Sequence, residues 1–403
     1  MIAQSQRETD VVIIGGGVIG LSVAWRSAQQ GLRVIVADPD PGQGATHAAA
    51  GMLTPIAEAA YAEREIFQLG NESLRRYPDF VAELAAASGL PTGFRQGGTL
   101  QVAYDSDDLA VLAETQRLQE SFGVRVQQLS GRECREAEPM LDPSVRGGLL
   151  VAEDGSVDPR LLATALQRAA EVAGARLVRQ RAAEVLCTEG RASGVRLAAD
   201  SVVSARWIVL AAGWQSAGIP GVPPGLAPPV RPVKGQILRL RTTTAMTAAG
   251  LPPGLLRRTV RGLVRGSSVY LVPRDSGELV VGATQEELGA DTAVTAGGLW
   301  ELLRDARALV PGVTELELAD VVAGLRPGTP DNAPVIGPSG LPGLLFATGH
   351  FRAGVLLAPV TADTMAAFLR TGEPDPIWRA FGADRFTARG RPDPQPEGAL
   401  ACG

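Results

Sequence analysis

The first part of the chain alternates short apolar runs with glycine turns and a helix-like segment. Val11-Val12-Ile13-Ile14 is a β-branched run that stops at three consecutive glycines. Apolar residues then recur at helical spacing as far as Gly31, and residues 33–38 form a second apolar run. Continuous apolar strands are typical of a sheet that is buried on both faces. The pattern therefore predicts a strand–helix–strand unit with a parallel sheet and a right-handed connection.

Later segments repeat these patterns. Residues 207–213 and 344–349 are apolar runs that end at glycine, and we expect both to join the same sheet. Residues 299–309 carry leucine and alanine at helical spacing and predict an amphipathic helix. A further helix is predicted before Gly174, with an apolar face made of Leu161, Leu162, Ala165, Leu166, Ala169 and Ala173.

Residues 269–274 and 279–284 are strand-like runs on either side of Asp275-Ser276-Gly277-Glu278, which predicts an antiparallel hairpin. With the turn centred between Ser276 and Gly277, Tyr270 faces Ala283 and Ser268 faces Gln285. Tyr270 and Gln285 then lie on one face of the hairpin as diagonal neighbours.

These elements predict an α/β protein. A Rossmann-like domain with a doubly wound, mostly parallel sheet is interrupted twice by a second domain with a mixed, largely antiparallel sheet. We expect the nucleotide-binding domain to comprise residues 1–87, 152–227 and 322–385, and the substrate-binding domain to comprise residues 88–151 and 228–321. Residues 386–403, rich in proline, glycine and arginine, are predicted to be a disordered tail.

Composition removes several classes of function. Hydrophobic residues make up 45% of the chain, enough for a large core, and the net charge of −5 gives no electrostatic case for binding nucleic acid or an anionic membrane. Three scattered cysteines (Cys134, Cys187, Cys402) and two distant histidines predict neither a disulfide framework nor a metal site. The polar start and the short apolar run after it match neither a membrane span nor a secretory signal, so a cytoplasmic enzyme is expected.

Gly15-x-Gly17-x-x-Gly20 lies directly between the first strand and its helix, and Asp38 ends the next strand. The first glycine permits the tight turn, the second lets a pyrophosphate approach the backbone, and the third lets helix and strand pack closely. Asp38 can accept hydrogen bonds from ribose hydroxyls. The motif predicts dinucleotide binding and leaves FAD and NAD as alternatives. The small residues from Gly42 to Met52 suit either a flat ring close to the backbone or a tightly packed helix start.

Several motifs in order resemble the FAD-dependent amine oxidases of the D-amino-acid oxidase type, and most closely the glycine oxidases of the thiamine pathway. The resemblance covers Asp10 to about residue 382. It rests on "DVVIIGGGVIGLSVAW", "ATHAAAGML", "DGSVDPRLL", "PVKGQ", "YLVPRDSGELVVGAT", "AGLRPGTPDNAPVIG" and "TGHFRAGVLLAP".

The resemblance implies FAD as the cofactor. It also implies oxidation of glycine and other small amines by hydride transfer from Cα to flavin N5, hydrolysis of the imine to glyoxylate and ammonia, and reoxidation by O₂ to hydrogen peroxide. A role in thiazole assembly and a homo-oligomer, with a tetramer as one form, follow from the same resemblance. The flavin is expected to be non-covalent, because no cysteine lies between Cys187 and Cys402.

By motif match, the cofactor contacts fall on the glycine turn, the small-residue run, one backbone site and the segment after the last predicted strand: Gly15, Gly17, Val18, Ile19, Gly20, Asp38, Ala45, Thr46, Ala50, Gly51, Met52, Ala183, His350, Phe351, Arg352, Ala353, Gly354, Val355 and Leu356. Backbone N–H groups of the last segment, at the start of a helix, would face the flavin edge that gains negative charge on reduction. Pro359 should kink that helix or place its true start later.

The resemblance also implies that Arg326 binds the substrate carboxylate, with Tyr270 adding a hydroxyl. Arg352 would line the pocket or hold the flavin. We expect a positional role for His350, because hydride transfer needs only a neutral amine. Lys234, the only lysine, is either an oxygen-activating cation or a structural residue, and we favour the structural role. Gln285 and Ser268 depart from the methionine and histidine of the glycine oxidase pattern. Sarcosine or small D-amino acids such as D-alanine, oxidised with O₂ or by a dehydrogenase of the same fold, are therefore alternatives to glycine.

Overall fold

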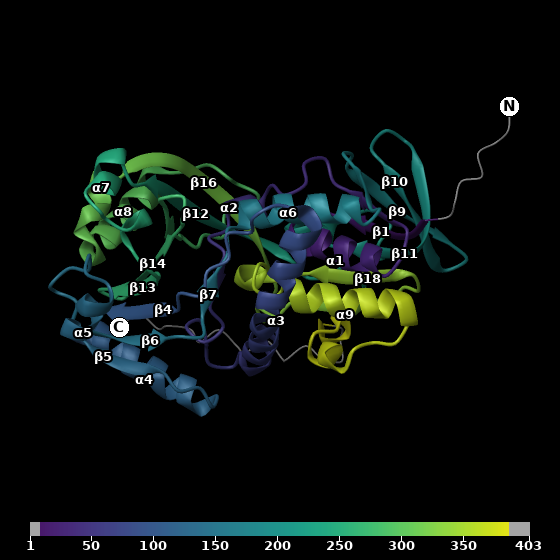
Figure 1. Cartoon of the computed structure of the whole chain (residues 1–403). Helices are drawn as coiled ribbons and strands as arrows, with labels where there is room; N and C mark the ends of the chain where they lie inside the picture. The colour runs from purple at the N-terminus through teal and green to yellow at the C-terminus, as the bar shows by residue number, and fades with distance from the viewer. Residues whose placement is uncertain (1–8, 387–403) are drawn as a thin grey trace.

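The computed structural model describes residues 9–386, which form two large β-sheets and one two-stranded sheet, with helices packed against the large sheets (Figure 1). The first sheet has the order β17-β18-β11-β1-β2-β8. Four of its parallel strands match the predicted apolar runs: β1 (Thr9–Ile14), β2 (Val34–Ala37), β11 (Val202–Leu210) and β18 (Leu344–Thr348). A fifth parallel strand, β8 (Arg176–Val178), was not predicted. The antiparallel members are β17 (Val335–Pro338), β9 (Ala182–Thr188) and β10 (Arg191–Leu197).

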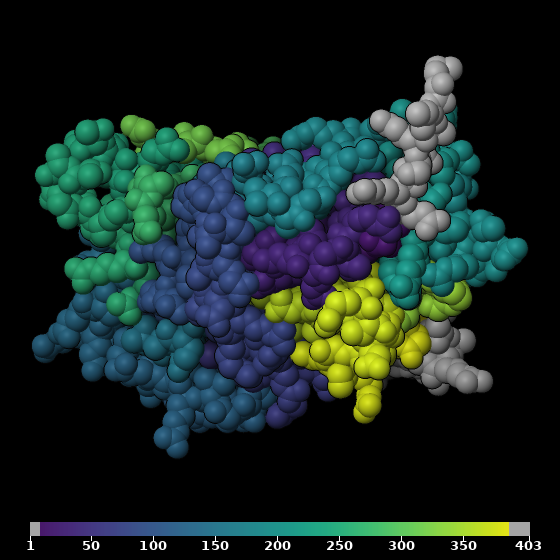
Figure 2. Space-filling model, turned by 45° about the vertical axis from the view of Figure 1, so that its right-hand side comes forward, coloured from purple at the N-terminus to yellow at the C-terminus, as the bar shows by residue number. Residues whose placement is uncertain are grey.

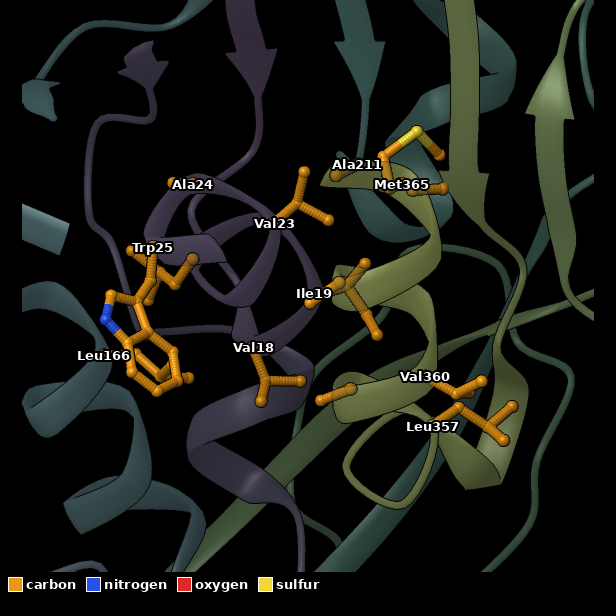
Figure 3. Packing of buried hydrophobic residues seen from close by; sticks show 14 of the residues in the cluster. Val18, Ile19, Val23, Ala24, Trp25, Leu166, Ala211, Leu357, Val360 and Met365 are labelled. Carbon is orange, nitrogen blue, oxygen red and sulfur yellow. The ribbon is translucent and has the colours of Figure 1, made fainter. Parts of the chain in front are cut away.

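Helices α1 (Val18–Gln29), α3 (Arg64–Ser88), α6 (Pro159–Val172) and α9 (Ala358–Thr371) build the main core beside this sheet. Figure 2 shows α1 lying between α6 and α9 on one face of the molecule. In Figure 3, Val18, Ile19 and Val23 of α1 point toward side chains of α9 such as Val360. This packing fixes the N-terminal end of α1, and with it the glycine turn.

Helix α6 differs from its prediction at one residue. Asp158 caps the helix by accepting the N–H groups of Arg160 and Leu161, and Pro159 occupies the first turn. Leu161, placed in the predicted apolar face, is 40% exposed. It precedes the buried stripe that starts at Leu162, and one residue corresponds to a rotation of about 100° around a helix.

The second sheet has the order β16-β12-β15-β14-β13-β4-β6-β5. All neighbouring pairs are antiparallel except β13 and β4, which agrees with the predicted mixed, largely antiparallel sheet. The strands are β4 (Thr99–Ala103), β5 (Gln127–Ser130), β6 (Gly147–Val151), β12 (Arg231–Arg241), β13 (Thr259–Val264), β14 (Ser267–Pro273), β15 (Glu278–Gly282) and β16 (Glu317–Gly328). Beside them lie α4 (Ser106–Ser121), α5 (Gly131–Ala137), α7 (Thr244–Ala248) and the predicted amphipathic helix α8 (Ala296–Leu309).

The β14–β15 hairpin exists, but its predicted register was wrong by one residue. Tyr270 pairs with Gly282 rather than Ala283. The loop has three residues, because Arg274 N–H bonds the Glu278 carbonyl and Gly277 N–H returns to the Arg274 carbonyl. Gly277 has a φ of +84°, the left-handed conformation that closes a three-residue hairpin loop.

Short elements join the two sheets: α2 (Ala45–Ala48), β3 (Met52–Leu53), β7 (Gly155–Ser156) and the 3₁₀ segments η1 (Gly213–Gly218) and η4 (Phe351–Ala353). The predicted domain boundaries stay predictions; the second sheet takes its strands from residues 99–151 and 231–328. Of the predicted tail, residues 387–403 lie outside the described residues, and Phe386 ends η6 (Ala383–Phe386). Within residues 9–386, no helix is long and apolar enough to span a membrane.

Candidate cofactor and substrate site

The glycine turn between β1 and α1 has the geometry that the motif predicted. Gly15 has a φ of +106°, and a Cβ there would lie 2.4 Å from the Ala211 carbonyl oxygen. A Cβ on Gly20 would lie 2.0 Å from the carbonyl oxygen of Gly15, so only glycine lets α1 approach the strand this closely. Asp38 accepts the Gly16 N–H at 2.6 Å, which ties the turn to the end of β2.

The small-residue run from Gly44 to Met52 packs tightly and also forms a wall beside the turn. Thr46 Oγ1 accepts the N–H of Val18 at 3.0 Å and thereby caps α1, whose own N-cap is a glycine. A Cβ on Gly51 would lie 2.0 Å from the Val157 carbonyl oxygen. The tight packing is confirmed, and because the segment also lines a cavity, a flat ring close to its backbone stays a prediction.

That cavity has a volume of about 1440 Å³ and runs from the glycine turn to the second sheet. It exceeds the roughly 300–1,000 Å³ of an ordinary small-molecule site, which leaves room for a dinucleotide and a small substrate. Its lining includes most of the predicted cofactor contacts: Gly15, Gly17, Val18, Ile19, Asp38, Ala45, Thr46, Ala50, Gly51, Met52, Ala183, His350, Phe351, Arg352, Gly354 and Val355. Gly20, Ala353 and Leu356 do not line it.

The segment after β18 is not the first turn of a long helix. Phe351–Ala353 form the short η4, and α9 begins at Ala358 with Pro359 in its first turn. Of the two effects expected from Pro359, a later helix start is the one observed. Proline suits the first turn of a helix because its missing N–H would have no partner there.

Arg326 on β16, Tyr270 on β14, and Gln285 and Ser268 all line the end of the cavity formed by the second sheet. The Arg326 guanidinium donates to the carbonyls of Lys234 at 3.3 Å and Thr284 at 3.2 Å. No carboxylate pairs with Arg326 among residues 9–386. Burial raises the pKa of Tyr270, and the nearby Arg326 opposes that rise, so the phenol stays protonated at neutral pH.

Two glycines that sequence reasoning left without a role make room for these side chains. A Cβ on Gly235 would lie 2.4 Å from both terminal nitrogens of Arg326, and a Cβ on Gly282 would lie 2.4 Å from the Tyr270 hydroxyl. Gly235 belongs to the quoted "PVKGQ" motif and Gly282 to "VVGAT". The motifs contained this signal, but only the strand pairing shows what the glycines face.

The predicted pocket residue Arg352 lines the cavity, but sequence reasoning missed its partners: Arg261 and Glu58, which line the cavity too, and Glu63, which does not. Arg261 on β13 pairs directly across from Tyr270 and forms a close ion pair with Glu58. Arg352 bonds Glu63 at 2.6 Å and lies 3.9 Å from Glu58. These four charges neutralise one another, whereas Arg326 keeps an unbalanced positive charge.

The surroundings of His350 and Lys234 are consistent with positional roles. His350 is 2% exposed, its Nε2 lies 3.1 Å from Thr361 Oγ1, and burial lowers its pKa to about 3. Its imidazole is therefore neutral at physiological pH. The Lys234 ammonium bonds Asp291 at 2.6 Å, which raises its pKa, and the residue does not line the cavity. No cluster of metal-ligating side chains occurs among the described residues.

The glycine turn with its positive φ, the wall of small residues and the length of the cavity fit an FAD molecule. Comparison with known proteins agrees. Residues 10–368 match the family described as "FAD dependent oxidoreductase" (DAO). The chain is 33% identical to the glycine oxidase of Bacillus licheniformis over 95% of this chain and 99% of that protein.

It is also 33% identical to the bifunctional protein ThiO/ThiG of Trichormus variabilis, over 94% of this chain and 55% of that protein. The chain thus spans about half the length of the bifunctional relatives it matches. Among solved structures, glycine oxidase from Geobacillus kaustophilus superposes with a TM-score of 0.84 at 30% identity, covering 94% of this chain and 99% of the other. The chain therefore belongs to the DAO family of FAD-dependent oxidoreductases.

Proposed function

We propose that the protein is an FAD-dependent oxidase of glycine and other small amines, which supplies the imine or glyoxylate used in thiazole assembly. One observation carries the proposal. Arg326 places an unbalanced guanidinium beside the Tyr270 hydroxyl in the same cavity as the glycine turn. A small zwitterion bound there by its carboxylate would lie between the Arg326 guanidinium and the wall of small residues.

Arg326 and Tyr270 would together bind the substrate carboxylate. The two carbonyl acceptors fix the Arg326 guanidinium, which leaves N–H groups for a two-pronged, charge-assisted pair with the substrate carboxylate. The protonated Tyr270 hydroxyl would donate a further hydrogen bond to that carboxylate. FAD, when bound non-covalently along the turn and the small-residue wall, would accept the hydride from the substrate Cα.

A side-chain base is not required at the reacting carbon. A neutral substrate amine can donate electron density as the hydride leaves, so kcat/KM should rise with pH as the amine deprotonates. His350 has the wrong setting for a base, since its Nε2 faces Thr361. We assign it the role of fixing the segment between β18 and α9, through its contact with Thr361.

Gln285 and Ser268 give the substrate end of the cavity a polar lining. We therefore propose that sarcosine and D-alanine compete with glycine as substrates. An anaerobic titration of the yellow holoprotein with each amine, followed through the flavin absorption band, tests this. We expect glycine to bleach the band and air to restore it with release of peroxide.

A flavin band that none of the three amines bleaches would overturn the proposal. Bleaching by sarcosine or D-alanine but not by glycine would replace glycine as the substrate. Reduction of a quinone-like dye without peroxide would replace the oxidase with a dehydrogenase of the same fold.

A further inference from the structure

The wall of small residues is held from behind by two buried arginines of the second sheet. Helix α2 has only four residues, too few to be stable by itself, and the carbonyls at its C-terminal end have no partners within the helix. These carbonyls need donors from elsewhere in the fold.

Arg239 of β12 and Arg274 at the β14–β15 turn donate to the carbonyls of residues 47, 49 and 50, and Arg160 of α6 adds a second donor to the His47 carbonyl at 3.2 Å. Arg239 Nη2 donates to the carbonyls of His47 at 3.4 Å and Ala49 at 3.3 Å. Arg274 Nη2 donates to the carbonyl of Ala50. Neither arginine lines the cavity, whereas Ala48, Ala49, Ala50, Gly51 and Met52 all do.

Both guanidinium groups are buried, and that of Arg274 lacks a close counter-ion. Arg239 is 1% exposed and bonds Glu278 at 2.5 Å, while Arg274 is 3% exposed and has only Asp158, at 4.0 Å, as a counter-ion. Nε of each arginine and Nη1 of Arg274 have no hydrogen-bond partner within the described residues. Burial lowers the pKa of Arg274 to about 10. An apolar side chain of similar length is often as stabilising as a buried ion, so stability alone does not account for these groups.

A second contact of the same sheet reaches the same wall. Gly324 of β16 packs so closely against α2 that a Cβ there would lie 2.5 Å from the Cβ of Ala48. We propose that Arg239 and Arg274 are positioning residues of the cofactor site. They hold the backbone of residues 47–50 in the position that FAD binding requires. The second sheet thereby sets the affinity for a cofactor that the two arginines do not touch.

The test measures FAD binding to the apoprotein of Arg239→Met and Arg274→Met, with Arg241→Met as the matched control. Arg241 is the exposed last residue of β12, on the same face as Arg239. We expect the Kd for FAD, measured by quenching of flavin fluorescence, to rise about tenfold or more in the first two variants and to stay unchanged in the control.

Urea unfolding of each apoprotein separates positioning from a merely structural role. Positioning predicts a weaker affinity for FAD under conditions in which each variant is still fully folded, whatever the shift of its unfolding midpoint. A structural role predicts a lower midpoint with an unchanged Kd, and a Kd within twofold of the wild type in both variants would overturn the proposal.

Arg274→Gln provides a second measurement if Arg274→Met does not fold. Its amide can still donate to Ala50, so we expect a Kd closer to that of the wild type than to that of Arg239→Met, and a Kd as weak as that of Arg239→Met would count against the proposal. None of these measurements includes an amine. Failure of the proposed glycine oxidation would therefore leave their outcome unaffected.

Discussion

At the scale of single residues, Arg326 should control substrate affinity without affecting the flavin. Replacing it with alanine removes the charge-assisted pair with the carboxylate, which is worth about 1.5–3 kcal/mol. We expect kcat/KM for glycine to fall by about tenfold to hundredfold, mostly through KM, with the flavin content of the purified protein unchanged.

Gly235→Ala offers an independent route to the same result, because its Cβ would overlap the guanidinium of Arg326. We expect it to weaken glycine binding while leaving residue 326 intact. Steady-state kinetics with glycine check both variants. Normal kinetics for Arg326→Ala would show that another residue binds the carboxylate.

His350 should make stability depend on pH. Its folded-state pKa of about 3 lies below the unfolded value of about 6.5, so the unfolded chain binds the extra proton first. Stability from this residue is complete above pH 6.5 and declines as the pH falls from there toward 3.

For His350→Gln, which keeps a hydrogen-bonding side chain for Thr361, we expect a loss of stability between pH 7 and pH 5 that is smaller than that of the wild type by about 2 kcal/mol. Urea unfolding at the two pH values measures it, and His47→Gln measures the contribution of the other histidine, whose partial burial also lowers its pKa. Equal losses in His350→Gln and the wild type would contradict the assignment.

Site residues could be predicted where they belong to a sequence motif. The prediction failed where only strand pairing brings the residues together. Tyr270 and Arg326 were found from their motifs and line the cavity as expected. Arg261 and Glu58 line it too, yet they lie about 200 positions apart and no motif joins them. Their position beside Tyr270 follows from the β13–β14 register, which places Arg261 opposite Tyr270.

At the scale of elements, the contact between α1 and β1 is limited by Gly20. A Cβ there would meet the backbone carbonyl of Gly15, which cannot rotate away as a flexible side chain can. We expect Gly20→Ala to destabilise the protein by about 1–3 kcal/mol and to weaken FAD binding. Thermal unfolding and flavin retention on gel filtration are the measurements.

Gly297→Ala is the matched control for that substitution. Gly297 lies in α8, and a Cβ there would meet nothing within 4 Å. Because alanine is the better helix former, the control should be more stable than the wild type by about 0.5–1 kcal/mol. If Gly20→Ala also gained stability, the close approach of α1 to β1 would not be limiting.

The register of the β14–β15 hairpin could not be predicted from the apolar pattern of its strands. Two strand-like apolar runs located both strands, but the loop length sets the register. A two-residue turn and a three-residue turn differ by one residue, and "RDSGE" permits both. The left-handed Gly277 selects the longer loop, a choice that depends on backbone conformation.

At the scale of the whole molecule, the sequence predicted two sheets but not how they share one cavity. The parallel sheet followed from uninterrupted apolar strands, and the mixed sheet from the hairpin and the amphipathic helix α8. Their junction depends on contacts such as Arg239 with Ala49 and Gly324 with Ala48. Those pairs lie far apart along the chain, so periodicity carries no information about them.

Because both sheets line the cavity, removing FAD should loosen the junction before it unfolds either sheet. A cofactor that binds only the folded protein adds about 2.7 kcal/mol to the free energy of unfolding at a concentration 100 times its Kd. In the apoprotein, backbone amides of residues 44–52 should exchange with deuterium faster than in the holoprotein.

Amides in β1 and β11, whose strand bonds are buried behind α1, should exchange at nearly the same rate in both forms. Hydrogen exchange measured by mass spectrometry with and without FAD distinguishes the segments. If protection fell equally throughout the first sheet, the cofactor would stabilise that whole sheet. If protection of residues 44–52 did not change, the wall would be rigid without FAD, and its small residues would serve packing alone.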